Sequence, residues 1–422
     1  MKKLLLIALL FAQASFAQRT VIYCGKLIDV KQMQVQTEMS IIIEGNKITD
    51  VQKGYITTSA SDKIIDLKNR TVMPGLIDCH VHMDHETNPD RTLKFSQNEA
   101  DIAFGSIQYA KITLMTGFTT VRDVGGSVNI AIRNAINKGL IVGPRIFTSG
   151  KALSSTGGHG DATNGLREDL MHIPELNSDV VNGVDECRKA VRQRYKDGAD
   201  LIKIASTGGV LSLEKDGAGA QFTEEEIRAI VLTAKDYGMK VAAHAHGAEG
   251  IKRAVRAGVA SIEHGTYVDD EAIELMKKMG TYHVPTIIAG KSVADSAKNK
   301  PGYFPEIIAA KAIAVGSVIQ DAFARTYKAG VKIAFGTDAG VYAHGKNWME
   351  FVYMNEAGMP AIECIKAATV SAADLLGNTS IGSIEKGKLA DVVAVDGDPI
   401  KDIKVMGNVK FVMKAGTVYK NE

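Results

Sequence analysis

From residue 74 onward, short apolar runs alternate with longer stretches of helical periodicity. The eight apolar runs lie at residues 76–80, 119–122, 145–149, 201–205, 240–244, 261–263, 283–286 and 332–335. Helix-like stretches between them include 99–115, 184–197, 223–237, 248–257 and 269–279, and the third begins with a capping box at 223–226. Such alternation is typical of a parallel sheet. Eight units over about 300 residues predict an α/β fold built on a (β/α)8 TIM-like barrel.

Both ends of the chain have β character without helical periodicity. Short β-like runs lie at 21–24, 39–43, 47–51 and 63–66, and again at 383–386, 391–395, 410–413 and 417–419. Turn residues such as Gly45-Asn46 separate them. We predict that residues 18–72 and 378–422 join into one small β-sandwich domain, and that residues 73–377 form the barrel.

The first 17 residues have the pattern of a cleavable signal peptide. Lys2 and Lys3 precede an apolar run at 4–12, and small residues end at Ala17. The apolar run is too short to anchor the chain in a bilayer. We therefore expect a periplasmic or secreted protein that has no membrane anchor.

Charge and cysteine content narrow the classes of partner. Without residues 1–17 the chain has 48 basic and 48 acidic residues, so neither nucleic acid nor an anionic membrane surface is an expected partner. The four cysteines are far apart in the sequence. We interpret them as buried thiols, although export leaves one disulfide open.

Potential metal ligands occur where several apolar runs end. His80 and His82 are two residues apart, so on a strand both imidazoles lie on the same face. Barrel active sites are built at the carboxyl ends of the strands. Ligand-type residues follow four more of the runs, and these are Lys203, His244 with His246, His264, and Asp338. This pattern predicts a metal site in the mouth of the barrel.

These motifs resemble those of the metal-dependent amidohydrolase superfamily. The similarity includes Pro-Gly-Leu-Ile-Asp-x-His-x-His at 74–82, the histidines after the fifth and sixth runs, Thr-Asp at 337–338 and the β-strand pair beginning at Gly382. Residues 121–126, 155–161, 202–209 and 244–247 are most similar to the Xaa-Pro and Xaa-Arg/Lys dipeptidases and the ochratoxin-hydrolysing amidases. The resemblance covers nearly the whole chain after residue 17.

The resemblance implies two divalent metal ions, with zinc preferred and manganese, cobalt or iron left open. His80, His82 and Asp338 would hold the deeper ion, and His244 and His264 the second. Lys203 would bridge both ions as a carbamate formed with carbon dioxide. A free ammonium would repel two cations, whereas a carbamate offers two hard oxygen ligands. The alternative for this lysine is an ion pair with a neighbouring carboxylate.

Several roles stay open at this stage. Spacing does not decide between His244 and His246 as the metal ligand, and we assign His244 to the metal and His246 to the substrate. Expected substrate contacts also include His159 in a glycine-rich loop, which would reach the substrate or its oxyanion, and Arg122. Tyr267 and His283 are expected to bind a substrate carboxylate, with packing in their loops as the alternative. Arg122 has the alternative of an ion pair with Asp123 beneath the site. We interpret His85, His172 and His344 as loop residues.

The implied function is that of a binuclear metallohydrolase. It would cleave an amide bond in a dipeptide or an N-acyl amino acid through attack by a metal-bridging hydroxide, with Asp338 as proton shuttle. The family relationship also allows a homo-oligomer.

Two other functions remain in view. One is a cyclic-amide hydrolase resembling imidazolonepropionase, or a deaminase, because His246-Gly-Ala-Glu249 imitates the His-x-x-Glu of deaminases. Such enzymes lack the bridging lysine, so Lys203 discriminates against both. The other is a non-catalytic binding protein on the same scaffold, which the complete set of ligand positions argues against.

Overall fold

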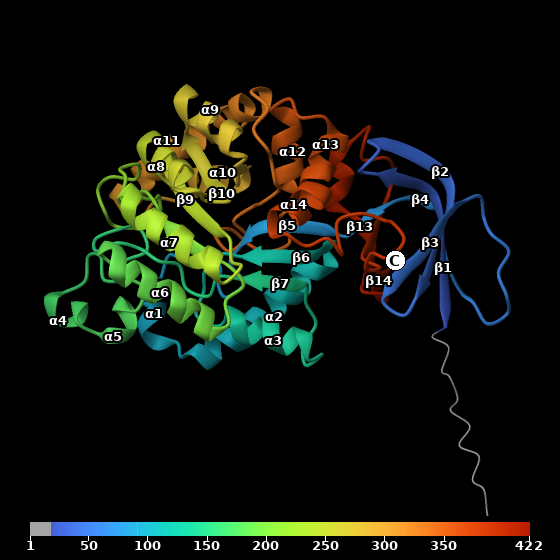
Figure 1. Cartoon of the computed structure of the whole chain (residues 1–422), viewed down its shortest axis with the longest axis horizontal. Helices are drawn as coiled ribbons and strands as arrows, with labels where there is room; N and C mark the ends of the chain where they lie inside the picture. Colours follow the sequence, from blue (N-terminus) through green and yellow to red (C-terminus); the bar gives the residue numbers. More distant parts are fainter. Residues whose placement is uncertain (1–17, 91) are drawn as a thin grey trace, which may run out of the picture.

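The computed structural model describes residues 18–90 and 92–422, so the predicted signal peptide lies outside the described residues. A barrel of parallel strands surrounded by helices makes up most of the molecule, and a β-sheet built from both chain ends lies beside it (Figure 1). This arrangement confirms the predicted fold class. The four cysteines are free and buried, as the sequence predicts.

Seven of the eight predicted barrel strands are present, in two parallel sheets. One sheet contains β5 (Leu76–Val81), β6 (Phe118–Asp123) and β7 (Arg145–Thr148). The other contains β8 (Ile202–Ala205), β9 (Val241–Gly247), β10 (Ser261–Tyr267) and β11 (Tyr282–Val284). The strands follow one another around the barrel in sequence order, which places their carboxyl ends at the same end of the molecule.

The barrel closes through isolated β-bridges at its two seams. Leu153 bridges Ile204 between the two sheets, and on the other side Ile333 bridges His283 while Ala339 bridges Val81. The predicted eighth strand at 332–335 is therefore not a regular strand among the described residues. The carbonyl of His80 accepts hydrogen bonds from the amides of both Thr337 and Asp338. Within the predicted run, the amide of Phe335 donates to the carbonyl of Ala367 in the π-helical turn and not to a neighbouring strand, so no regular ladder forms.

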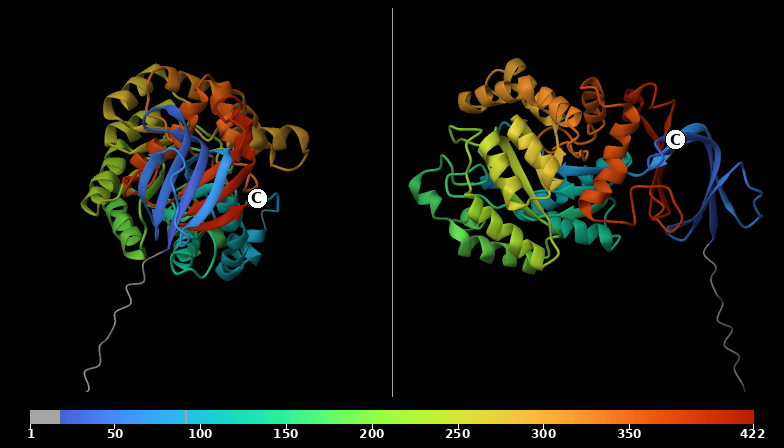
Figure 2. Two further views of the ribbon diagram at one scale, coloured as in Figure 1. Left: turned by 90° about the vertical axis from the view of Figure 1, so that its right-hand side faces the viewer. Right: turned by 45° about the horizontal axis from the view of Figure 1, so that its top comes forward.

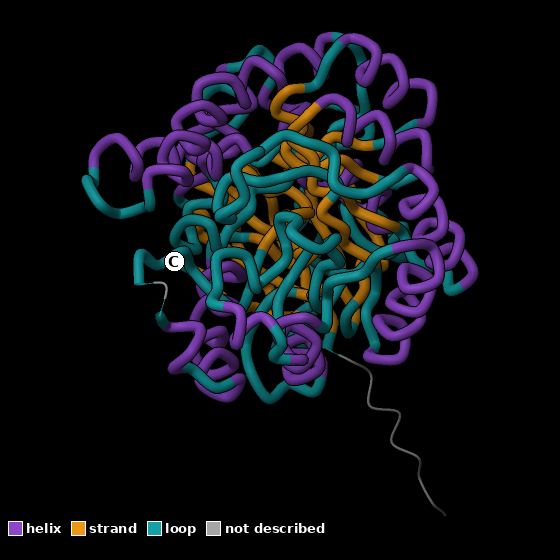
Figure 3. The backbone as a smooth tube through the Cα atoms, turned by 90° about the vertical axis from the view of Figure 1, so that its left-hand side faces the viewer, coloured by secondary structure: helices purple, strands orange, loops and turns teal. Residues whose placement is uncertain are grey.

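Helices surround the strands, and loops cover the end of the barrel that faces away from the small sheet (Figure 3). The longer helices are α2 (Glu99–Met115), α3 (Asn129–Asn137), α6 (Gly183–Asp197), α7 (Glu224–Asp236), α8 (Ala248–Ala257), α9 (Asp270–Met279), α10 (Ile287–Asn299), α11 (Glu306–Lys328), α12 (Met349–Glu356) and α13 (Ala361–Lys366). A π-helical turn (Ala367–Ser371) leads into α14 (Ala372–Leu376). The short helices α1 (Leu93–Ser96), α4 (Glu168–Met171) and α5 (Pro174–Asn177) lie in loops.

Local sequence explains how these helices begin and which side they bury. Thr223 and Glu226 form the predicted capping box at the start of α7. In α8 the apolar residues Ile251, Ala254 and Val255 are buried at helical spacing. Of the described helices, α11 alone is long and apolar enough to cross a membrane, and as a barrel helix it buries one side against its neighbours.

The small domain is one seven-stranded sheet in the order β14-β13-β12-β4-β1-β2-β3. Its strands are β1 (Arg19–Asp29), β2 (Gln34–Glu44), β3 (Lys47–Lys53), β4 (Lys63–Pro74), β12 (Val392–Asp396), β13 (Val409–Lys414) and β14 (Thr417–Asn421), with a 3-10 turn (Ile403–Gly407) before β13. The chain ends meet where β12 pairs with β4, with Ala394 opposite Val72. Figure 2 shows strands from both ends side by side.

The sheet curls so that its buried faces enclose one apolar core. Lys47 at the start of β3 bridges Leu389, and the amide of Gly416 donates to the carbonyl of Ala390, which brings the two edges together. The predicted run at 383–386 is not a strand, because Gly382 and Gly387 on either side adopt positive φ angles and turn the chain. The remaining predicted runs of this domain lie within strands.

Candidate metal centre at the carboxyl ends of the strands

A cavity of about 260 Å³ opens at the carboxyl ends of the barrel strands. Potential metal ligands from five different strands or strand ends line it. They are His80, His82, Lys203, His244, His246, His264 and Asp338, and His85 and His159 lie at the same cavity. The structure thus brings together every residue that the sequence analysis assigned to metal binding.

His80, His82 and Asp338 form the first group of potential ligands. The Nε2 atoms of His80 and His82 lie 3.3 and 3.2 Å from Oδ1 of Asp338. The Nδ1 atom of His82 lies 2.8 Å from the carbonyl oxygen of Gly125, so this nitrogen carries the proton and donates. In the neutral imidazole, Nε2 then presents its lone pair toward the Asp338 carboxylate.

This arrangement fits a divalent cation. Oδ1 of Asp338 is buried and has no hydrogen-bond partner, although two imidazole nitrogens face it. Lone pairs and a carboxylate repel one another unless a cation or a proton lies among them. Burial alone would lower the pKa of His82, but the neighbouring Asp338 outweighs it and raises this pKa to about 9. Two imidazole nitrogens and a carboxylate oxygen are typical zinc ligands.

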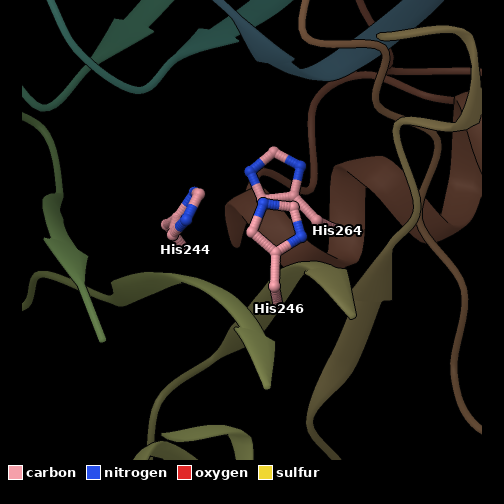
Figure 4. Close-up of side chains that lie close together, drawn as sticks. All are labelled: His244, His246 and His264. Carbon is pink, nitrogen blue, oxygen red and sulfur yellow. The ribbon is translucent and has the colours of Figure 1, made fainter. Parts of the chain in front are cut away.

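His244, His246 and His264 form the second group (Figure 4), and one nitrogen from each lies within 4.8 Å of the others. Nδ1 of His246 and Nδ1 of His264 each lie 2.7 Å from a threonine hydroxyl, Thr266 and Thr286 respectively. Nε2 of His244 lies 3.1 Å from the carbonyl of Gly208 and donates to it, which leaves Nδ1 free. All three rings keep one nitrogen available to a metal.

The three histidines of the second group are in the protonation state that metal binding requires. Burial lowers the pKa of His244 and of His264 well below the usual range, and lowers that of His246 to about 3. The imidazoles are therefore neutral at physiological pH, which is the form that binds metal ions. Because all three histidines converge, the choice between His244 and His246 stays open.

Backbone strain is concentrated at these residues. His264 and Asp338 adopt left-handed conformations, with φ of +72° and +60°, and Thr286 has φ of +51°. Such conformations are rare for side chains other than glycine and are costly for a β-branched residue. The surrounding structure holds them in place, and in each case the side chain reaches the cavity or supports a residue that does.

Lys203 is near both groups, since the charge of Asp338 acts on it and its own charge acts on His244 and His264. Its side chain is buried at the cavity. The carboxylates of Glu263 and Asp338 are near enough to raise its pKa, so the alternative of a lysine paired with a neighbouring carboxylate stays a prediction. Burial outweighs both charges and lowers the pKa of Lys203 to about 8. At pH 7 such a lysine is still mostly protonated, but its neutral fraction is far larger than that of an exposed lysine.

Glu263 is a supporting residue that sequence reasoning missed. One of its oxygens accepts from Nδ1 of His80 at 2.8 Å, and the other accepts from the Arg122 guanidinium at 2.8 Å. Burial would raise the pKa of Glu263, but the charge of Arg122 outweighs it and keeps this pKa well below the usual range. The carboxylate thus fixes the tautomer and orientation of His80. The sequence signal that could have identified Glu263 is its position directly before the candidate ligand His264.

The structure corrects the prediction that Arg122 contacts the substrate. Its guanidinium is buried, donates to the carbonyl of Cys79, to Ser261 and to Glu263, and does not line the cavity. The alternative pairing with Asp123 is also wrong, because Glu263 is the partner of Arg122. Arg122 therefore supports the site from beneath.

Two further predicted substrate contacts are not supported. His283 is fully buried, and its two ring nitrogens are engaged by the Thr326 hydroxyl and the His264 carbonyl. Both its nitrogens are used inside the barrel, so it cannot reach a substrate. Tyr267 is 37% exposed and does not line the cavity. It is the last residue of β10, and its side chain is exposed at the surface.

His159 does line the cavity, stacked on His244 with 4.3 Å between ring centroids. Its Nδ1 lies 2.6 Å from the Ser212 hydroxyl, which leaves Nε2 for the cavity. A Cβ at Gly209 would lie 2.2 Å from this ring, so only glycine permits the approach. His85, interpreted from sequence as a loop residue, also lines the cavity.

The glutamate of the deaminase-like motif is not part of the cavity. Glu249 is exposed on α8, where it pairs with Arg253 at 2.9 Å. It follows His246 in sequence, but the helix turns its side chain to solvent. The similarity to a deaminase motif is therefore a coincidence of spacing.

Comparison with known proteins gives consistent results. Residues 71–419 match the model of the amidohydrolase family. Ochratoxinase of Aspergillus niger is 34% identical, over 98% of this chain and 89% of that protein. The crystal structure of a Xaa-Pro dipeptidase with methionine bound in its active site is 53% identical, with a TM-score of 0.92 over 96% of this chain and 100% of that chain. A prolidase complexed with N-methylphosphonate-L-proline is 35% identical, with a TM-score of 0.88 over 96% of this chain and all of that chain.

Substitution of Glu263 tests whether its carboxylate orients His80. In Glu263→Gln the side chain keeps its shape but loses the charge that faces His80 and Arg122. We expect the affinity for zinc to fall by about 10–100-fold, since residues that orient ligating imidazoles have effects of this size. Competition with a chromophoric chelator measures it.

Glu249→Gln, on the surface of α8, is the matched control and should keep wild-type affinity. Wild-type zinc affinity in a folded Glu263→Gln protein would show that this contact does not orient a metal ligand.

Proposed function

The chain belongs to the amidohydrolase family and is a hydrolase that acts on amide bonds, and we propose that it is an exported binuclear metalloenzyme acting on dipeptides or N-acyl amino acids. It would release the C-terminal amino acid. The observation that carries the proposal is the buried Lys203, which lines the same cavity as two groups of candidate metal-ligand side chains. Relatives that include a Xaa-Pro dipeptidase and a prolidase support the substrate class.

The proposed ligands divide between the two groups. His80, His82 and Asp338 would hold one ion, and His244 and His264 the other, with Lys203 shared between them. Bound divalent metal ions activate water and polarise a scissile carbonyl. Imidazole and carboxylate ligands favour zinc, although ligand type alone does not exclude manganese or iron.

Lys203 would complete the site after reaction with carbon dioxide. Carbamate formation requires the neutral amine, and burial increases the neutral fraction by lowering the pKa of Lys203 to about 8. The product carries a negative charge and two oxygen ligands, which compensates the cations that an ammonium would repel. Arg122 and Glu263 beneath it already neutralise each other.

The other side chains of the cavity would then transfer protons and bind the substrate. The Asp338 carboxylate accepts a proton from the attacking water and passes it to the departing amine nitrogen. Nε2 of His159 faces the cavity because Ser212 engages Nδ1, and it would donate to a substrate oxygen. Nε2 of His246 is available in the same way because Thr266 holds its other nitrogen.

An activity assay on a panel of substrates tests the proposed function directly. Zinc-loaded protein beginning at residue 18 is incubated with dipeptides, N-acyl amino acids, cyclic amides and amino-heterocycles, and free amino acids and ammonia are measured separately. We expect amino acids from the first two groups, because the cavity joins a metal site to the space for a small amide. Ammonia alone, or ring opening alone, would assign the chain to the deaminase or cyclic-amide alternative.

Removal of the lysine tests the bridging role. Lys203→Ala should lose bound metal and reduce kcat/KM by on the order of 10³-fold, because metal ions contribute several kcal/mol to such reactions. Acetate or propionate should partly restore activity by standing in for the carbamate. Lys240→Ala is the control, since Lys240 donates to the carbonyls of Asp374 and Leu375 at the amino end of β9.

Full activity of Lys203→Ala without added acid would contradict the binuclear assignment. Equal losses in the Lys240 variant would indicate a general loss of stability.

The choice between His244 and His246 has its own test. We expect His244→Asn to bind one metal ion per chain and His246→Asn to keep two, with a higher KM, because His246 is assigned to the substrate. Metal analysis of the purified variants gives the stoichiometry. The reverse pattern would make His246 the ligand.

A further inference from the structure

Two helices and one loop contribute only apolar residues to the cavity. These are Val210 and Leu211 from the loop after β8, Ala289, Gly290 and Val293 of α10, and Val315 and Ile319 of α11. The charged groups and histidines that line the cavity come instead from the ends of the strands and the loops that follow them. We call the five residues of α10 and α11 the apolar wall.

Close packing of the two helices makes the apolar wall rigid. A Cβ at Gly290 would lie 3.0 and 3.1 Å from two carbon atoms of Ile319, and a Cβ at Gly316 would lie 2.8 Å from the carbonyl oxygen of Gly290. These glycines let the helices approach each other directly at the cavity. The shape of the wall is therefore set by the fold and not by mobile side chains.

Hydrogen bonds fix both helices relative to the metal side. The buried Glu350 of α12 accepts from the amides of Ile287 and Ile288 at the start of α10, at 2.9 and 2.8 Å. Lys311 of α11 donates to the carbonyls of Ser212 and Glu214, in the loop whose Ser212 also holds His159. The wall and the substrate-facing His159 are thus connected through one loop.

We propose that the apolar wall is the side-chain subsite of the enzyme, and that it selects substrates with an aliphatic residue such as leucine or methionine next to the scissile amide. This proposal rests on the proposed function. A cavity of about 260 Å³ has room for a small amide with one such side chain beside the metal site. Burial of a methylene against an apolar surface is favourable, and a polar or charged group there finds no partner.

The structure of a 53% identical relative is consistent with this ligand class, because that Xaa-Pro dipeptidase holds methionine in its active site. In this chain such a side chain would lie against the apolar wall, which has no charged group to pair with lysine or glutamate. A charged substrate side chain there would lose its hydration without gaining a partner, so it is disfavoured.

The test measures binding separately from turnover. Zinc-loaded enzyme is titrated calorimetrically with leucine and asparagine, which have the same shape, and with methionine and glutamine. We expect the aliphatic member of each pair to bind at least about tenfold more tightly, the discrimination typical of one to two buried carbon groups. Hydrolysis of the matching dipeptides, with the varied residue on either side of the amide, identifies its position.

Two variants test whether the apolar wall causes the preference for aliphatic side chains. Val293→Thr keeps the size of the side chain but adds a hydroxyl, and should reduce the leucine-to-asparagine ratio severalfold. Ile319→Ala enlarges the cavity and should shift the preference toward phenylalanine. Ile313→Ala, on the exposed side of α11, is the control and should leave both ratios unchanged.

Equal binding of leucine and asparagine by the wild type would overturn the proposal, as would an unchanged ratio in both wall variants. Selective leucine binding without hydrolysis of any peptide or N-acyl amino acid would uphold the subsite and refute the proposed function.

Discussion

The structure depends on the buried convergence of imidazole lone pairs with the Asp338 carboxylate. The Nε2 atoms of His80 and His82 face Oδ1 of Asp338 at 3.3 and 3.2 Å, and this oxygen has no hydrogen-bond partner. Such a set of electron donors is unstable in a protein interior unless a cation or a proton lies among them, and the pKa of His82 is accordingly raised to about 9. The surrounding barrel holds these side chains together around that positive charge.

A layer of supporting contacts provides that restraint. Glu263 orients His80 and is neutralised by Arg122, while threonine hydroxyls orient His246 and His264. The same layer maintains the left-handed conformations of His264 and Asp338. Because these partners are buried and mutually satisfied, the ligands are positioned before any metal or substrate binds, which lowers the cost of forming the complex.

The two sides of the cavity perform different tasks. The residues from the strand ends are mostly polar and would carry the amide chemistry, whereas the residues from α10 and α11 are apolar. Substitutions in α10 and α11 can alter which substrate side chain is accepted without displacing a metal-ligand residue. This separation of reaction and selection is a property of barrels, in which strand ends and surrounding elements vary independently.

The sequence by itself determined the barrel, the small β domain from both ends and the set of candidate ligands, because strand–helix periodicity and ligand spacing are local properties. Tertiary structure decided what depends on contacts between distant segments. Arg122 pairs with Glu263 across the barrel, His283 is occupied by Thr326, and Glu249 turns to solvent despite its motif. The amide of Phe335 likewise bonds to Ala367, so isolated bridges stand where an eighth strand was predicted. Partners of a buried polar group are chosen by three-dimensional proximity, which spacing along the chain does not encode.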